Sequence, residues 1–150
     1  MAVTFDGSSI SPDLSALLTT TGSWFHYTTG SFRYLVAGLA GFDALQDLTG
    51  VTAIFSGLSA NASMTRLGIN SVANSNQVVL FGLANPNLGS GYIELSSIPG
   101  TFTALAGGAI SFNGVDQNTS TGSYVGNTTN TSVTISHFDD MVTAILFEGG

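Results

Sequence analysis

Short apolar runs, separated by glycine, asparagine, serine and proline, make up most of this 150-residue chain. The runs are rich in Val, Ile, Phe, Thr and Gly, a composition that suits strands better than helices. No helical periodicity extends beyond a short segment near Pro12. Several short strands with turn residues between them are typical of a β-sandwich or barrel. We therefore predict an all-β fold. The predicted strands are Ser23–Thr28, Phe32–Ala40, Val51–Phe55, Thr65–Asn70, Val78–Leu83, Tyr92–Ser96, Ala104–Phe112, Ser132–His137 and Met141–Phe147.

The first 22 residues differ from the rest and are predicted to form an N-terminal arm ahead of a single domain at residues 23–150. Within the arm, Ser11 is a candidate helix cap, with Pro12 at the first helical position and Asp13 in the first turn. This pattern predicts one or two helical turns over Ser11–Leu18. An extended arm that docks on a neighbouring subunit suits the same residues, and both alternatives stay open.

Charged residues are scarce: the chain has two Arg, nine Asp or Glu and no Lys, which is 7% of its residues. A soluble domain usually has about 25%. With a formal charge of −7 and no cluster of cations, we expect neither a nucleic-acid partner nor an anionic membrane surface. A surface of Thr, Ser, Asn and Gly does little to oppose close approach of a neighbour, as expected of a subunit in an assembly.

The chain has no cysteine, so no disulfide or thiolate metal site is expected. The N-terminal residues reach Asp6 without a cation or an apolar run, so we expect no signal peptide and synthesis in a host cytoplasm. Apolar runs such as Leu35–Ala40 are too short to span a bilayer.

Aromatic residues in the segment Trp24, His26 and Tyr27 suggest a platform on which sugars stack. The alternative is a strand with one face in the core and the other at a subunit contact, because interfaces also favour aromatic residues. We favour the second interpretation.

The two histidines are weak candidates for chemistry. His137 lies near Asp139 and Asp140, but strand alternation places Asp140 on the opposite face from the other two. Two histidines, His26 and His137, without a spaced third ligand do not indicate zinc. We expect the carboxylates to cap backbone amides at a loop end.

Other polar residues also favour structural roles. Asp43 and Asp47 lack the oxygen spacing of a calcium loop, so a surface turn is expected. The segment Gly89–Gly91 is too short for the strained nucleophile turn of a serine hydrolase. Arg33 and Arg66 are each expected to pair with a carboxylate, within the domain or across a subunit boundary.

The segment around the last glycine pair has the clearest local pattern. Gly107-Gly108 inside a strand lets a ring or another backbone approach closely, or marks a bulge. Ile110 and Phe112 alternate toward one face, and Asn113-Gly114 ends the strand in a turn. Asp116 is placed to accept backbone N–H bonds in the following loop.

The order of these segments along the chain resembles that of a known family of β-sandwich modules. The resemblance is carried by Arg33–Leu39, by Val51–Phe55 with Gly57, and most sharply by Gly108–Gln117. Over residues 23–148 the chain resembles a jelly-roll β-sandwich module of tailed-phage structural proteins and large bacterial surface proteins. It departs from that pattern at Phe55-Ser56-Gly57, where the modules have Tyr-Asn-Gly. The resemblance implies a fold and a structural role, with no catalytic motif to transfer.

Together these features predict a non-enzymatic virion protein without cofactor or metal, a capsid decoration (cement) protein that bridges capsomers. Its expected partners are itself, as a trimer or dimer, and the major capsid protein. The alternative is a glycan- or receptor-binding module of a fibre or cell-surface adhesin, and a third possibility is a tube or filament subunit. The candidate contact residues are Phe5, Leu14, Leu17, Leu18, Trp24, Phe25, Tyr27, Phe42 and Tyr124.

Overall fold

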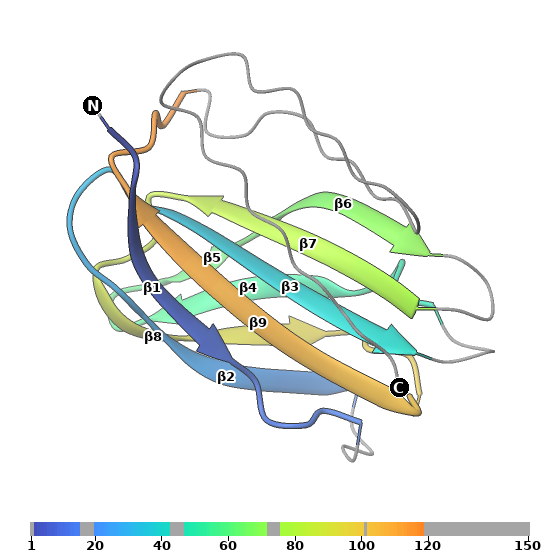
Figure 1. Cartoon of the computed structure of the whole chain (residues 1–150). Coiled ribbons are helices and arrows are strands. Elements are labelled where there is room, and N and C mark those ends of the chain that lie inside the picture. Colours follow the sequence, from blue (N-terminus) through green and yellow to red (C-terminus); the bar gives the residue numbers. More distant parts are fainter. Residues whose placement is uncertain (1, 16–19, 43–46, 72–75, 101, 119–150) are drawn as a thin grey trace.

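Two antiparallel β-sheets make up the structure, a computed structural model that describes residues 2–15, 20–42, 47–71, 76–100 and 102–118. One sheet lies in front of the other in Figure 1. The all-β prediction is confirmed, and the part of the chain that is described contains no helix. The strands are β1 (Thr4–Ile10), β2 (Thr21–Thr28), β3 (Tyr34–Phe42), β4 (Thr52–Gly57), β5 (Asn61–Ser63), β6 (Thr65–Ser71), β7 (Asn76–Ala84), β8 (Gly89–Ser96) and β9 (Ala104–Asn113).

The strand pairing is nested. The five-stranded sheet has the order β1-β9-β3-β7-β6, and the four-stranded sheet has the order β2-β8-β4-β5. Thus β1 pairs with β9, β2 with β8 and β3 with β7, so early strands lie beside late ones. All of these pairs are antiparallel, and β1 forms one edge of the larger sheet (Figure 1).

Seven predicted strands match β2, β3, β4, β6, β7, β8 and β9, while the predicted strands Ser132–His137 and Met141–Phe147 lie outside the described residues. Strands β1 and β5 were not predicted. Part of the predicted arm is therefore a paired sheet strand. Residues 11–15 form no helix, and residues 16–19 of the predicted helical turns lie outside the described residues.

The core lies between the sheets and is apolar. Its largest fully buried side chains include Leu35, Leu39, Phe55, Phe81 and Ile93. β3 is buried along nearly its whole length, as its apolar sequence predicts. Because successive side chains of a strand point to opposite faces, neighbours of core residues on β3 and β9 form a second cluster on the outer face of the five-stranded sheet. This outer cluster contains Tyr34, Val36 and Phe112, with Val3, Ile110 and Val115 packed against it.

The segment around Gly107 has the predicted local features. A Cβ atom on Gly107 would lie 2.8 Å from the indole of Trp24, so the glycine lets this ring cross from the other sheet. At Gly108 the nearest atom would be 3.6 Å away, an ordinary contact. After β9, Gly114 has a φ of 75°, and Asp116 accepts the Asn118 N–H at 2.8 Å. The close approach, the turn and the role of Asp116 are confirmed.

Replacing Gly107 with alanine is expected to destabilise the protein by about 1–3 kcal/mol, because the added methyl overpacks the site against Trp24. The neighbouring Gly108→Ala variant is the matched control and should stay within about 0.5 kcal/mol of the parent. Urea unfolding of the three proteins measures both changes. Equal stability of the two variants would show that Trp24 does not require the glycine.

Candidate functional site

A chain of four polar side chains crosses the interior between the sheets. Ser9 Oγ lies 2.8 Å from His26 Nδ1, and His26 Nε2 lies 3.1 Å from Ser111 Oγ. The Ser111 hydroxyl in turn donates to Asp6 Oδ2 at 2.8 Å. His26 and Ser111 are buried, with 1% and 0% of their surface exposed. The chain connects β1, β2 and β9, and therefore joins the two sheets.

The hydrogen bonds assign the tautomer of His26. Since the Ser111 hydroxyl gives its only proton to Asp6, its oxygen accepts from His26, and Nε2 therefore carries the proton. The unprotonated Nδ1 then accepts from the Ser9 hydroxyl. Every member of the chain is satisfied with a neutral imidazole. A second proton on His26 would require the Ser9 hydroxyl to turn away and accept.

Asp6 is the anchor at the other end of the chain. Burial by itself would raise the pKa of Asp6, but hydrogen bonds from Thr29, Ser111 and Asn113 outweigh burial and lower it. The Thr29 backbone N–H donates to Oδ2 at 2.9 Å, and the Thr29 hydroxyl donates to Oδ1. Asp6 therefore stays ionised and binds the turn after β2 as well as β9.

Burial also shifts the pKa of His26. Because desolvation disfavours the charged imidazolium, the pKa of His26 is lowered, although the nearby Asp6 carboxylate acts in the opposite direction. The residue types match those of a catalytic Ser-His-Asp set, but the order does not. Here Ser111 stands between Asp6 and His26 and is fully buried, so its hydroxyl cannot meet a substrate. What this arrangement does is hold β1 and the two sheets together.

The structure separates the candidate contact residues into two groups. Leu14 and Trp24 belong to the core, with 2% and 4% of their surface exposed. The exposed members are Phe5 at 59%, Phe25 at 50%, Tyr27 at 55% and Phe42 at 39%. Leu17, Leu18 and Tyr124 lie outside the described residues.

The structure also places the three residues of the sugar-platform hypothesis on two faces of the sheet: Trp24, His26 and Tyr27 do not form one surface. Alternation along β2 places Trp24 and His26 inside, and only Tyr27 points outward. The outward residues are Phe25 and Tyr27, and Phe25 lies opposite Tyr92 of β8. Tyr92, which is half exposed, was missed because strand register, not spacing in the sequence, brings it to this face.

Arg33 and Arg66 bind oxygens other than carboxylates. Arg33 donates to the carbonyl oxygens of Gly30 at 2.6 Å and Pro86 at 2.8 Å, and Arg66 donates to the carbonyl oxygen of Thr49. No carboxylate partner within the domain is found among the described residues. Pairing across a subunit boundary stays a prediction.

Of the remaining candidates, Asp47 lies in a local turn, where it accepts the Thr49 N–H at 2.9 Å as expected. Asp43, His137, Asp139 and Asp140 lie outside the described residues. Across the residues that are described, no group of three or more His, Cys, Asp or Glu side chains is arranged to hold a metal. No helix in this part of the chain has the length and apolar character needed to cross a bilayer.

Comparison with known proteins finds no match to a family model, a curated protein or a solved structure.

The stability of the protein is expected to fall as the pH decreases from about 7 to 5. Since burial lowers the pKa of His26 below its ordinary 6.5, the unfolded chain binds a proton more readily than the folded chain. The stabilisation due to neutral His26 is therefore complete above pH 6.5 and is lost as the pH falls through the folded-state pKa. The measurement is the urea midpoint at successive pH values.

The His26→Gln variant is the comparison protein. It should be less stable at pH 8, because a buried ring is lost, and its stability should change less between pH 7 and 5. His137 is present in both proteins, and Asp6 titrates at lower pH, so the difference isolates His26. Parallel pH profiles of the two proteins would contradict the assignment.

Proposed function

We propose that the chain is a non-enzymatic structural subunit of a virion, a capsid decoration protein of the tailed-phage type with a jelly-roll fold. It acts by association, binding copies of itself and the major capsid protein. The observation that carries this proposal is the edge strand β1, which pairs on one side only within the described residues and whose apolar side chains Phe5 and Ile10 are exposed.

The nested strand pairing supports the jelly-roll assignment. A jelly roll has eight antiparallel strands in two sheets, built from two Greek keys. The pairs β1·β9, β2·β8, β3·β7 and β4·β5 form a long hairpin, and the pairs β9·β3 and β8·β4 roll it up. β6 then adds one strand beside β7.

The exposed apolar side chains of β1 support association. Asp6 is the only charged residue in β1, β9, β3 and β7, and its side chain is engaged by Ser111 and Thr29. On β1 the side chains of Phe5 and Ile10 are 59% and 85% exposed. An isoleucine so exposed on an edge strand is unusual for a monomer, because edge strands normally have charges or proline that block pairing.

The edge position suggests how two copies meet. Because β1 pairs only with β9, one row of its backbone N–H and C=O groups is free of sheet pairing within the described chain. Antiparallel pairing of β1 with β1 of a second copy around a two-fold axis would continue the sheet and bury both Ile10 side chains. The bulge between Phe5 and Gly7 limits this pairing to the second half of the strand.

Light scattering during size exclusion is expected to show a discrete oligomer for the parent chain and a smaller species for Ile10→Lys. The lysine places a charge at the proposed contact without touching the core, so the folded monomer should keep its structure, with an unchanged circular dichroism spectrum, while any loss of stability should depend on protein concentration. Leu88→Lys is the control, because Leu88 is 61% exposed in the turn before β8 and should leave the mass unchanged. A monomeric parent chain would contradict self-association.

The virion role is tested separately by cosedimentation of the chain with purified tailed-phage capsids stripped of accessory proteins. Saturable binding, with a fixed ratio of chain to capsid protein, is expected for the capsid of the source virus. Absence of binding to that capsid would contradict the proposed decoration role, even if the chain self-associates.

A further inference from the structure

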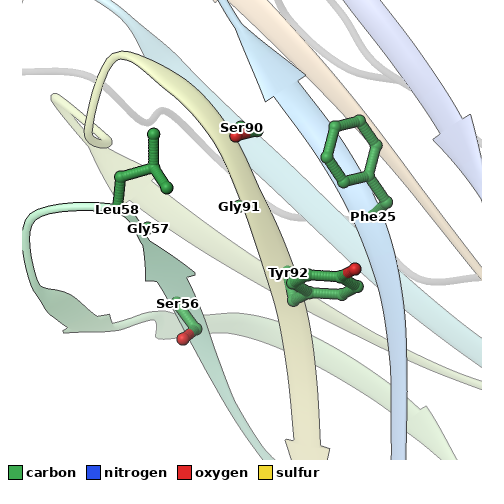
Figure 2. Close-up of a pocket in the computed structure, with 7 residues that line it drawn as sticks. All are labelled: Phe25, Ser56, Gly57, Leu58, Ser90, Gly91 and Tyr92. Atoms are coloured by element: carbon green, nitrogen blue, oxygen red, sulfur yellow. The ribbon is translucent and has the colours of Figure 1, made fainter.

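The outer face of the four-stranded sheet is different in character from the face proposed for association. It combines exposed aromatic rings with hydroxyl groups, and we call the part formed by Phe25, Tyr27, Leu58 and Tyr92 the aromatic face. Phe25 lies opposite Tyr92 on paired strands β2 and β8. Their ring centroids are 5.9 Å apart and their planes are at 80°. Figure 2 shows both rings on one side of the β8 backbone and Leu58 on the other.

A small hollow lies between these side chains. Its volume is about 120 Å³, and its apolar lining comes from Phe25, Leu58 and Tyr92 (Figure 2). Ser56 and Ser90 also line it, and the Ser56 hydroxyl, which donates to Asn61 Oδ1 at 2.9 Å, can act toward a ligand as an acceptor. The hollow is smaller than the roughly 300–1,000 Å³ of a typical ligand pocket, so a ligand would lie on this face and not inside it.

The size of the aromatic face favours a small ligand over a second subunit. Phe25, Tyr27 and Tyr92 are each about half exposed. With roughly 150–250 Å² per aromatic side chain, they present about 300 Å² together. A stable protein interface buries about 800 Å² on each partner, whereas patches of about 300–600 Å² on monomers are often functional sites.

Charge restricts the class of ligand. Glu94 is the only charged residue in the sequences of β8, β4 and β5, and the histidine of β2 is buried and neutral. With no cation on these strands, an anionic ligand has no partner. Glu94 follows Tyr92 by two residues on the same face of β8, about 7 Å further along. Its carboxylate and the serine hydroxyls can bond to hydroxyl groups of a ligand that stacks on Tyr92.

We infer that the aromatic face binds a neutral pyranose unit of a surface glycan, stacked on Tyr92 between Phe25 and Leu58. The C–H groups on one face of such a sugar meet the negative face of an aromatic ring, while its hydroxyls meet Ser56, Ser90 and Glu94. Because Phe25 and Tyr92 are nearly perpendicular, the rings do not form a flat platform. Each ring therefore contacts one sugar unit at most.

Saturation-transfer NMR on the full chain tests this inference. The probes are methyl β-D-glucopyranoside, methyl β-D-galactopyranoside, N-acetylglucosamine, N-acetylneuraminic acid and tetramethylammonium. Transfer to at least one of the three neutral sugars is expected, with roughly tenfold weaker binding in Tyr92→Ser. Phe5→Ser is the matched control, since Phe5 is equally exposed on the other sheet and its loss should leave sugar binding unchanged.

Three results would overturn the inference: no transfer to any neutral sugar, equal transfer in Tyr92→Ser and the parent, or binding of tetramethylammonium or N-acetylneuraminic acid in place of the neutral sugars. The inference does not rest on the decoration role. Sugar binding and self-association use opposite sheets, so Tyr92→Ser should leave the oligomer mass unchanged and Ile10→Lys should leave sugar binding unchanged.

Discussion

The partly buried carboxylate of Asp6 positions the strand on which the proposed assembly depends. β1 contributes no large apolar side chain to the core, since its Phe5 and Ile10 are exposed. Apart from its backbone pairing with β9, β1 is held by the hydrogen bonds of Asp6 and Ser9. Buried polar groups are costly when unpaired and specific when satisfied. The chain from Asp6 to Ser9 thus fixes β1 in place without using its apolar residues.

This arrangement leaves the apolar side chains of β1 available outside. In an ordinary edge strand, Ile10 would face the core and a charged residue would face solvent. In β1 the polar residues face inward. Its only charged residue, Asp6, accepts hydrogen bonds from Thr29, Ser111 and Asn113. This reversed arrangement leaves Ile10 in contact with water, which is unfavourable for the folded state unless another surface covers the side chain. An association surface on this sheet gives that arrangement a physical reason.

Apolar, β-prone runs with clear turns were predictable from the sequence. β3 and β9 follow directly from their apolar content and from Asn113-Gly114 at the end of β9. β1 was missed because its inward residues are polar and because a bulge between Phe5 and Gly7 leaves Asp6 without a partner in the register, which breaks the two-residue alternation. β5 was missed because three residues give no recognisable period.

The candidate sites were less predictable than the fold, because they depend on which strands lie side by side. Nothing in the spacing of Phe25 and Tyr92, or of Asp6 and Ser111, indicates contact, and strand order alone brings them together. The hydrogen bonds of Arg33 and Arg66 could not be predicted from the sequence either. They were expected to pair with a carboxylate within the domain or across a subunit boundary, but among the described residues both bind backbone carbonyls, which any loop can supply and no composition reveals.

The scarcity of charge connects these observations. The ionised groups that the structure describes in detail are largely engaged within the fold: Asp6 by three side chains, Asp47 and Asp116 by turn amides, and Arg33 by carbonyl oxygens. Both proposed binding faces therefore act mainly through apolar contact and hydrogen bonds to uncharged partners, and Glu94 is the one charged side chain that either proposal uses. Such contacts are not screened by salt, whereas binding through charged patches weakens as ionic strength rises. A protein built in this way keeps its contacts over a wide range of ionic strength, because its charges stabilise its own strands and turns.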